Sequence, residues 1–418
     1  KKYVKNISEY KYFVNGIIVR LFGVSGFISV YYFYYRGGDS FAYFIGAKAL
    51  GKLLLDDPIK GLHIFLNLDS PLNSWFSFNH QTGSPQWYMW KDPKTFSVSR
   101  FSSVFSIISF HSYIVTSFIT ACFSYIGTWK LYRLFNVYYP GNSKIFAYLI
   151  IFMPSLIFWG GGLMKDSFVL GSTCWITYNF YCIFIKRRKI FWNSVAFALN
   201  LYIIISIKPY IIISVIPGIL LWLNSFYLKN IKSLVIKIFL FPFLILMIGG
   251  AGFFIFDNLS SEMGVYGDID SAVSQAVVIQ EDLLRSEQYG SNNYNIGEID
   301  GTLSGLVRVA PIAIFTAIFR PLFWEIGSPT MIISAVENTF LFLFTIYILL
   351  ITGPIKLSKA FYNDPFLVYC FVFSLLLAFG VGIAGTNFGA LVRYRIPILP
   401  FFFPMLFVVY KKVIKKQL

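Results

Sequence analysis

Charged residues are scarce in this 418-residue chain: only 13% of its residues are Asp, Glu, Lys or Arg, while 57% are hydrophobic. A soluble domain is about one quarter charged and about half apolar. The scarcity of charge therefore excludes a soluble globular protein, and the mean hydropathy of +0.66 agrees. Several apolar runs reach about 20 residues, the length that crosses a bilayer as a helix. Because the runs are continuous rather than alternating, they predict helices and not membrane strands.

Cysteine and histidine are rare as well, with four and three residues. All four cysteines lie inside apolar runs at spacings that suit neither a metal site nor a disulfide framework, so we interpret them as small core residues. The three histidines show no ligand spacing, and no zinc site is predicted. A glycine-rich phosphate loop is also missing, which disfavours nucleotide-sugar chemistry. The N-terminal residues are too polar, and the first apolar run too long, for a cleaved signal peptide.

Ten apolar runs predict membrane-spanning helices, with boundaries good to a few residues. They lie near residues 14–35, 103–127, 145–161, 167–185, 191–207, 209–227, 238–256, 330–353, 366–385 and 396–410. A further apolar segment, 305–320, could be an eleventh. The predicted fold is an all-α polytopic membrane protein that forms a single membrane domain over residues 1–418.

The basic residues predict the topology, because Lys and Arg gather on the cytoplasmic side of membrane proteins. If the N-terminus is cytoplasmic and 305–320 does not cross, the inner segments hold 20 of the 35 Lys and Arg but two of the 19 Asp and Glu. Both termini are then cytoplasmic, and 305–320 is interfacial or re-entrant. The positive net charge is mostly a topology signal, so no nucleic acid is expected. Two long loops, 36–102 and 257–329, lie outside.

The first outer loop opens with Arg36-Gly37-Gly38-Asp39-Ser40, directly after the first apolar run. The two glycines allow a sharp backbone turn, and residues 40–55 are typical of an amphipathic helix in the membrane interface. Aromatic residues follow, and their rings suit the interface better than sugar stacking. They are Trp75, Trp87, Tyr88 and Trp90. In the second loop, residues 271–289 are predicted to be helical.

Charges at membrane depth are functional by default, and under this topology five segments place theirs on the outer face. They are Asp39, Lys165-Asp166, Lys208, the pair Arg320 and Glu325, and Arg393-Tyr394-Arg395. Taken singly, each has a structural explanation, such as a turn ion pair or a snorkelling arginine. Their common side favours one functional site. The predicted catalytic residues are Asp39, Asp166 and Lys165, and the predicted substrate-binding residues are Arg393, Tyr394, Arg395, Tyr43, Lys208, Arg320 and Glu325. Asp39 and Asp166 suit a general base and a metal or acceptor anchor, and arginines suit a phosphate. The pattern favours glycosyl transfer from a polyprenyl-phosphate sugar.

At these positions the chain resembles the C-type (GT-C) integral-membrane glycosyltransferases. Those enzymes carry an Asp just after helix one with an aromatic residue a few positions on, which here are Asp39 and Tyr43. They also carry a proline about ten residues before a basic-acidic pair, similar to Pro154 and Lys165-Asp166, and a late Arg-Tyr segment, similar to Arg393-Tyr394-Arg395. The resemblance implies a hexosyltransferase with Asp39 as base, Asp166 as second acid, and Arg393 and Arg395 as phosphate ligands. A Trp-Trp-Asp motif is absent.

The expected partners are a polyprenyl-phosphate-linked sugar, the lipid bilayer and an extracytoplasmic glycan, lipid or protein acceptor. A divalent cation, Mg²⁺ or Mn²⁺, could bind Asp39 with Asp56, Asp57 and Asp69. High Lys, Phe, Tyr and Ile usage suggests a bacterial inner membrane, with the active site facing the periplasm or exterior. One alternative is a polysaccharide polymerase that joins undecaprenyl-diphosphate-linked units, a class the chain also resembles. A transporter or lipid flippase would predict mid-span charges and internal repeats. A structural membrane subunit is the third alternative.

Overall fold

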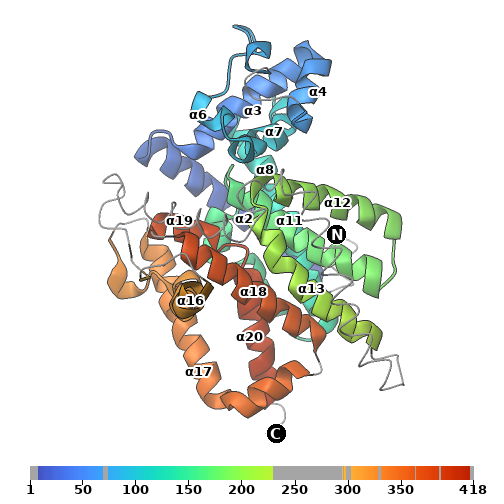
Figure 1. Ribbon diagram of the computed structural model, residues 1–418, viewed down its shortest axis with the longest axis vertical. Coiled ribbons are helices and arrows are strands. Elements are labelled where there is room, and N and C mark those ends of the chain that lie inside the picture. Colours follow the sequence, from blue (N-terminus) through green and yellow to red (C-terminus); the bar gives the residue numbers. More distant parts are fainter. Residues whose placement is uncertain are drawn as a thin grey trace. The chain divides into compact units, whose positions relative to one another are not determined.

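The computed structural model describes residues 8–68, 74–228, 294, 296–297, 303–327, 331–362, 364–385 and 387–414. Every regular element in these residues is a helix: there are 16 α-helices, with short 3₁₀ and π segments beside them (Figure 1). The prediction of an all-α protein is confirmed. The chain divides into two compact units. The first holds the described residues up to Ile183 with Arg188–Lys208, and the second holds Phe184–Arg187 with those from Pro209 onward.

The first unit opens with helix α2 (Lys11–Ser29), which continues as the π-helical segment η2 (Val30–Tyr34). Four α-helices then precede the longest helix of the unit, α8 (Tyr113–Tyr138). These are α3 (Asp39–Asp56), α4 (Pro58–Leu66), α6 (Trp87–Trp90) and α7 (Pro93–Ile108). After α8 come α9 (Ser143–Phe146), η4 (Ala147–Ile151), α10 (Pro154–Trp159), α11 (Lys165–Phe180) with its continuation η5 (Tyr181–Ile185), and α12 (Ile190–Ile207).

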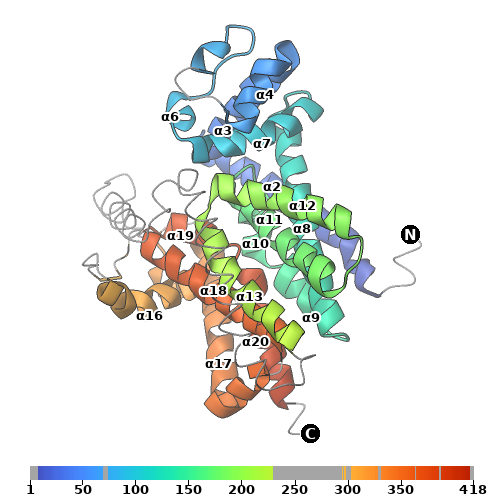
Figure 2. The ribbon, with the colours of Figure 1, turned by 45° about the vertical axis from the view of Figure 1, so that its right-hand side comes forward.

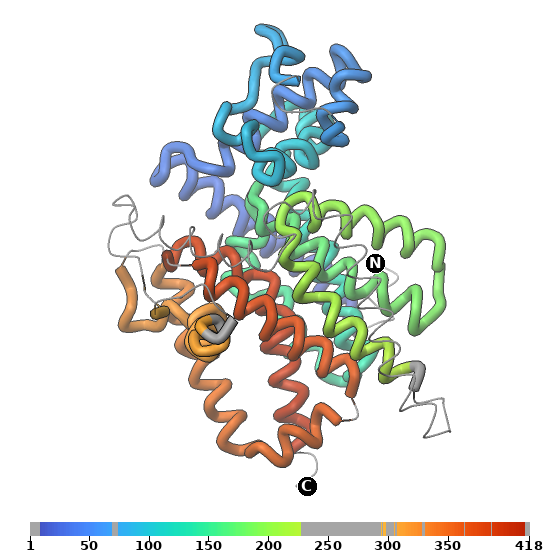
Figure 3. The backbone as a smooth tube through the Cα atoms, in the orientation of Figure 1, coloured from blue at the N-terminus to red at the C-terminus, as the bar shows by residue number. Residues whose placement is uncertain are grey.

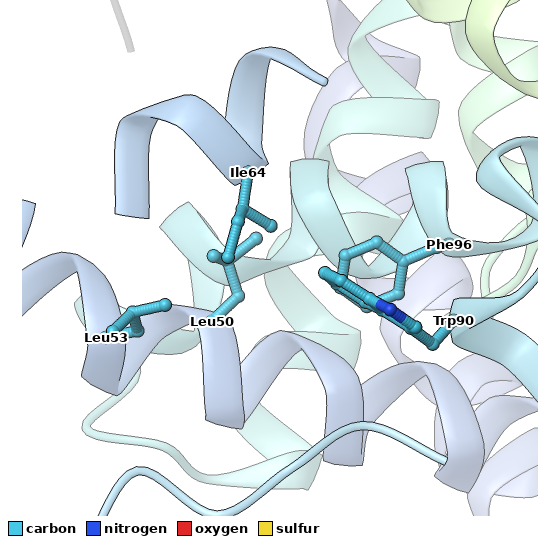
Figure 4. Packing of buried hydrophobic residues seen from close by; sticks show 5 residues of the cluster. All are labelled: Leu50, Leu53, Ile64, Trp90 and Phe96. Atoms are coloured by element: carbon cyan, nitrogen blue, oxygen red, sulfur yellow. The ribbon is translucent and has the colours of Figure 1, made fainter. Parts of the chain in front are cut away.

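Helices α3, α4, α6 and α7 pack around an apolar cluster of their own, shown close up in Figure 4. Its buried members are Leu50, Leu53, Ile64, Trp90 and Phe96. The rings of Trp90 and Phe96 meet edge to face, with centroids 4.6 Å apart, a favoured aromatic arrangement. Trp90 therefore serves core packing, in contrast to its predicted place among interfacial rings.

Two aspartates fix where helices of this group begin. Asp57 accepts a hydrogen bond from the backbone N–H of Lys60 at 3.2 Å, and Asp92 accepts one from Lys94 at 3.0 Å. Each aspartate is followed by a proline at the first helical position. An Asp cap before a proline is a strong helix-start signal. As a result much of the segment 36–102, predicted as a loop with one helix, is folded into several helices.

Helices α8 and α11 approach closely because their contact is built from small residues. A Cβ added at Gly127 would run into the backbone of Gly171, and one added at Gly171 would lie 2.9 Å from the Cα of Ser124. Ser124 and Thr128 are fully buried in this unit. Small residues at helix contacts are the usual packing of membrane helices, where van der Waals contact replaces the hydrophobic effect. This close contact between α8 and α11 holds α11 in place, and the N-terminus of α11 carries Lys165 and Asp166.

The second unit is built around α18 (Pro365–Ala384), which packs on α13 (Tyr210–Leu228), α16 (Leu303–Phe319) and α20 (Leu399–Ile414). Both views in Figures 1 and 2 show α13 running beside α18. The short elements η8 (Phe323–Glu325) and α19 (Phe388–Tyr394) complete the unit. Helix α17 (Ile332–Tyr362) packs on α20 and bends at Gly353, whose φ is 63°, just before Pro354. The bend is visible in the orange part of the tube in Figure 3.

Within the described residues, five helices are long and apolar enough to cross a membrane. They are Lys11–Tyr34, Lys165–Ile185, Ile190–Ile207, Ile332–Tyr362 and Pro365–Ala384, and they match five of the predicted runs. Up to seven result when two bent pairs, α7 with α8 and α19 with α20, each count as one span. These apolar helices mark a multi-pass membrane protein that associates with a lipid bilayer. Helices α13, α16 and α20 match the runs 209–227, 305–320 and 396–410, whereas 238–256 and 271–289 lie outside the described residues.

The predicted span 103–127 is wrong as one straight helix. Helix α7 begins at Pro93 and ends at Ile108, and α8 starts at Tyr113 at an angle of 112° to it. Serine side chains stabilise the break: the Ser109 hydroxyl donates to the Ser106 carbonyl at 3.0 Å, and the Ser106 hydroxyl lies 2.9 Å from His111 Nδ1. Such side-chain to backbone bonds compete with helix hydrogen bonds.

The predicted span 145–161 is also interrupted. Pro154 begins α10, and Met153 before it is extended, with a ψ of 123°, because a proline disfavours the helical conformation of the preceding residue. The carbonyl of Leu156 in α10 accepts a hydrogen bond from the guanidinium of Arg20, which also donates to Thr128 Oγ1 at 3.3 Å. Arg20 lies in the middle of α2 with a fully buried side chain. Sequence reasoning missed this intramembrane arginine, which ties the broken helix to its neighbours.

Candidate functional site

Asp39 lies at a sharp turn between η2 and α3. Arg36, Gly37 and Gly38 have φ values of 51°, 148° and 95°, so the turn predicted at the two glycines is confirmed. The left-handed conformation costs a residue with a Cβ about 1–2 kcal/mol, so the backbone at Arg36 is strained. Asp39 then takes the first position of α3. The partial positive charge of the helix N-terminus stabilises its carboxylate there.

Residues on the buried face of α3 contact α7 and α8 and thereby hold the turn in place. The Ser40 hydroxyl lies 2.8 Å from the Tyr113 hydroxyl of α8. Tyr43 is buried, and its backbone carbonyl accepts a hydrogen bond of 3.0 Å from Ser99 of α7. The backbone at the start of α3 is thus fixed by two other helices. The substrate-binding role of Tyr43 stays a prediction.

A cavity of about 640 Å³ opens beside this turn. Its walls come from η2, the turn, the first two turns of α3, and the α6 region. The lining residues are Tyr32, Phe33, Arg36, Gly37, Gly38, Phe41, Ala42, Ile45, Gln86 and Tyr88. A volume of this size lies within the roughly 300–1,000 Å³ range of small-molecule sites, and such sites combine apolar walls with a few polar groups.

A second cluster of charges forms at the N-terminus of α11. Asp166 and Lys208 make an ion pair at 2.7 Å, with side chains that are 4% and 8% exposed. Asp166 stands in the first turn of α11, and Lys208 caps the C-terminus of α12. Each charge therefore sits at the helix end whose dipole stabilises it. The structure brings these two predicted residues into direct contact.

Lys165 links this ion pair to α7. Its ammonium donates to Thr95 Oγ1 at 2.7 Å, and the Thr95 hydroxyl in turn donates to a carboxylate oxygen of Asp92. The charge of Lys165 also interacts electrostatically with Lys208, Asp39 and Asp166. Four of the residues predicted from sequence, Asp39, Lys165, Asp166 and Lys208, therefore lie within one electrostatic group in the first unit.

Tyr88 connects the cavity to Asp39. Burial of its phenol, and next the negative charge of the Asp39 carboxylate, raise the pKa of Tyr88. A carboxylate disfavours a second negative charge nearby, so the phenol remains protonated at neutral pH. The Tyr88 hydroxyl can therefore donate a hydrogen bond to a ligand in the cavity.

The segment Gly160–Gly162 packs closely against α2. This contact fixes the position of Lys165 and Asp166, which follow it in the chain. A Cβ at Gly161 would lie 2.6 Å from a methyl carbon of Val24, and a Cβ at Gly162 would overlap the ring of Phe27. The run was open to interpretation as a flexible turn, and the contacts show a packed one instead. The Ser167 hydroxyl closes the turn by donating to the Gly162 carbonyl at 2.5 Å.

The predicted residues of the second unit make contacts within that unit. Arg320 pairs with Glu325 at 2.5 Å, and Glu325 also accepts a hydrogen bond of 2.8 Å from the backbone N–H of Leu322. The Arg320 guanidinium lies over the rings of Tyr294 and Phe388, 5.1 and 5.2 Å from their centroids. These cation–π contacts and the ion pair hold the segment after α16 in place. A role in substrate binding stays a prediction for both residues.

Arg395 is fully buried and tied to the protein backbone. One terminal nitrogen donates to the carbonyls of Ile318 and Arg320, at 3.2 and 3.1 Å, and the other donates to the Asn338 amide oxygen. These bonds connect the end of α16 to α17. Arg393 and Tyr394 are half-buried in α19. A phosphate-binding role for Arg393, Tyr394 and Arg395 stays a prediction.

The possible divalent cation has no preformed cluster in the part of the chain that the structure describes: no group of three His, Cys, Asp or Glu is arranged to hold one. Asp39 and Asp56 stand at opposite ends of α3, a helix of about 27 Å. Asp57 caps α4 and pairs with Lys60 at 2.9 Å. Asp39 therefore cannot share an ion with Asp56 or Asp57, and Asp69 lies outside the described residues.

Sequence reasoning missed several residues that the structure places here. Asp92 had a usable signal, because an Asp before Pro93 marks a helix start, and a helix starting there brings α7 to the Lys165 side chain. Arg36 stood in the opening motif without a role. Arg20 had the signal of a lone cation inside an apolar run. For Thr95 and the Tyr88 hydroxyl we find no signal in the sequence.

Comparisons of this chain with protein families, with curated proteins and with solved structures gave no match.

Proposed function

We propose that the protein is a membrane glycosyltransferase that moves a sugar from a polyprenyl-phosphate donor to an extracytoplasmic glycan, lipid or protein acceptor. Asp39 is the general base in this proposal. The observation that supports it best is the place of Asp39: it starts α3 beside a cavity of about 640 Å³ and interacts with both Tyr88 and Lys165. The proposed setting is a bacterial inner membrane, with the site facing the periplasm or exterior.

The proposed reaction is a displacement at the anomeric carbon of the donor sugar. The acceptor hydroxyl gives its proton to the Asp39 carboxylate while its oxygen forms the new glycosidic bond. The bond between the anomeric carbon and the phosphate oxygen breaks, and the polyprenyl phosphate leaves with the bonding electrons. Hydrogen-bond donors and cations aimed at the phosphate stabilise the charge that develops on it.

Asp166 and Lys208 have a positioning role in this proposal. Their buried ion pair fixes the first turn of α11, and that turn carries Lys165. The Lys165 ammonium, held by Thr95, keeps a positive charge close to Asp39.

The test is transfer by the purified protein in nanodiscs, with a radiolabelled sugar on undecaprenyl phosphate and a panel of acceptors. Release of undecaprenyl phosphate that depends on an acceptor supports the proposal. Asp39→Asn should lower turnover at least a hundredfold, the scale of a lost general base, and leave donor binding intact. The matched control is Asp56→Asn at the exposed far end of the same helix, which should keep wild-type turnover. Wild-type turnover in Asp39→Asn would refute the assignment.

A transporter or lipid flippase is a second candidate, favoured by the buried pair between Asp166 and Lys208. Ionisable groups inside membrane helices often form proton relays. A flippase would move a fluorescent polyprenyl-linked sugar across a liposome membrane without consuming it, whereas a transferase consumes the donor. The acceptor separates a transferase from a polysaccharide polymerase: a polymerase needs a second diphosphate-linked unit.

A further inference from the structure

The cavity beside the turn has one charged side chain in its lining. Among the described residues that form its walls, Arg36 carries the charge, while Gln86, Tyr88 and Tyr32 supply neutral donors. The remaining residues are apolar or glycine. A cavity with a cation, three neutral donors and aromatic walls suits an anion that is attached to an apolar group.

The backbone turn at Arg36 fixes the place of this residue beside the cavity. Arg36 has a φ of 51°, which strains a residue with a side chain, and it is followed by two glycines that take positive φ without cost. The turn keeps the Arg36 backbone at the cavity wall and three residues from Asp39.

The part of the cavity wall that least suits a water-soluble ligand is formed by η2. Tyr32 and Phe33 line the cavity, and both belong to the candidate membrane span Lys11–Tyr34. Their side chains are 59% and 73% exposed. An apolar chain that lies in the bilayer along this span would reach the cavity from its membrane end. The two rings meet edge to face with centroids 5.0 Å apart, and Tyr32 also lies 6.2 Å from the Phe41 ring, so they form one exposed aromatic surface at the cavity wall.

We propose that this cavity binds the phosphate headgroup of an isoprenoid lipid, with the Arg36 guanidinium on the phosphate, Gln86 and the Tyr88 hydroxyl as further donors, and Tyr32 and Phe33 against the first isoprene units. The inference rests on the proposed function and names its donor site within the first unit. It assigns the phosphate to Arg36 of the first unit, whereas the sequence had indicated Arg393 and Arg395. In this arrangement the sugar attached to the phosphate lies toward Asp39.

The test measures binding without turnover, so that it can fail separately from the glycosyl transfer. The wild-type protein in phosphatidylcholine nanodiscs is titrated with undecaprenyl phosphate, undecaprenol, phosphatidylglycerol and inorganic phosphate, and binding is followed by native mass spectrometry. Undecaprenyl phosphate should bind at least tenfold more tightly than each of the other three, because only it joins a phosphate monoester to an isoprenoid chain. Equal binding of phosphatidylglycerol or inorganic phosphate would overturn the inference.

Substitutions at Arg36 test whether this residue binds the phosphate. Arg36→Gln should weaken the binding of undecaprenyl phosphate about tenfold or more, the scale of lost charge-assisted hydrogen bonds. Arg36→Lys should lose less, because an ammonium binds phosphate as a point charge without the guanidinium fork. The matched control is Arg187→Gln: Arg187 is exposed, has the same φ of 51° and is not among the cavity residues.

The outcomes separate the two proposals. Binding that depends on Arg36, in a protein that transfers no sugar, supports the cavity assignment and refutes the proposed function. Sugar transfer with a wild-type KM for the donor in Arg36→Gln supports the function and refutes the cavity assignment. Wild-type binding in Arg36→Gln, with unchanged melting temperature, refutes the cavity assignment by itself.

Discussion

Replacing Lys208 by Met should destabilise the protein by about 3–5 kcal/mol, because the change removes the ammonium that pairs with the buried Asp166 carboxylate. The two side chains are 8% and 4% exposed and their charged atoms are 2.7 Å apart, so water cannot substitute for the lost ammonium. Asp166→Asn, which removes the carboxylate charge beside the buried Lys208 ammonium, should cost a similar amount. The two groups also stand at favourable helix ends, which contribute about 0.3–1 kcal/mol each.

The double variant Asp166→Asn with Lys208→Met removes both charges at once. Only the helix-end contributions and the hydrogen bond are then lost, so the double variant should cost about 1–2 kcal/mol, less than either single change. Equilibrium unfolding in detergent micelles, followed by circular dichroism, measures all three variants against the wild type. Lys60→Met is the control, because Lys60 pairs with Asp57 at the surface and exposed pairs contribute little.

A double variant that loses as much as the sum of the two single variants would refute this reasoning, since the two charges would then not be coupled. The same proteins separate structure from catalysis. If Asp166 only positions α11, the double variant should regain the proposed transfer activity together with stability. Activity that stays lost in the stable double variant would make Asp166 itself part of the reaction.

Two further predictions concern the turn and the cavity. Gly162→Ala should destabilise the protein by about 1–3 kcal/mol in the same unfolding experiment, because the new Cβ overlaps the Phe27 ring; Gly26→Ala in α2, where a Cβ meets no atom within 4 Å, should not destabilise it. Asp39→Asn should lower the pKa of Tyr88, since the carboxylate charge helps to raise it; the ¹³Cζ tyrosine resonance that disappears in Tyr88→Phe reports the titration, and an unchanged pKa would contradict the proximity of the two groups.

Helix existence was predictable from the sequence where apolar runs are long and uninterrupted. The five spans that the structure supports are of this kind, and the end predicted for 330–353 coincides with the bend at Gly353. The helix group between Asp39 and Asp92 was less predictable. Its two Asp-Pro caps are local signals that were present, whereas the burial of Trp90 depends on which helices pack together.

The breaks in predicted spans depended on interactions between distant residues. The corner between α7 and α8 is held by serine and histidine side chains that bond locally, and hydropathy does not register such bonds. The break before Pro154 is supported by Arg20, which is 136 positions away from Leu156. Pairing of Asp166 with Lys208 spans 42 positions. The sequence indicated that these two charges share a face but could not indicate that they touch.

The packed glycine run has a mechanical consequence for the first unit. A helix can slide along its neighbour only if its side chains leave the grooves of that neighbour. Here Val24 and Phe27 of α2 fill the space that is free because Gly161 and Gly162 lack a Cβ. Arg20 adds a tether to the same short segment. An axial shift of α2 would therefore carry Lys165 with it. A displacement of η2, at the end of α2, would therefore also move the backbone at the first turn of α11, which carries Asp166.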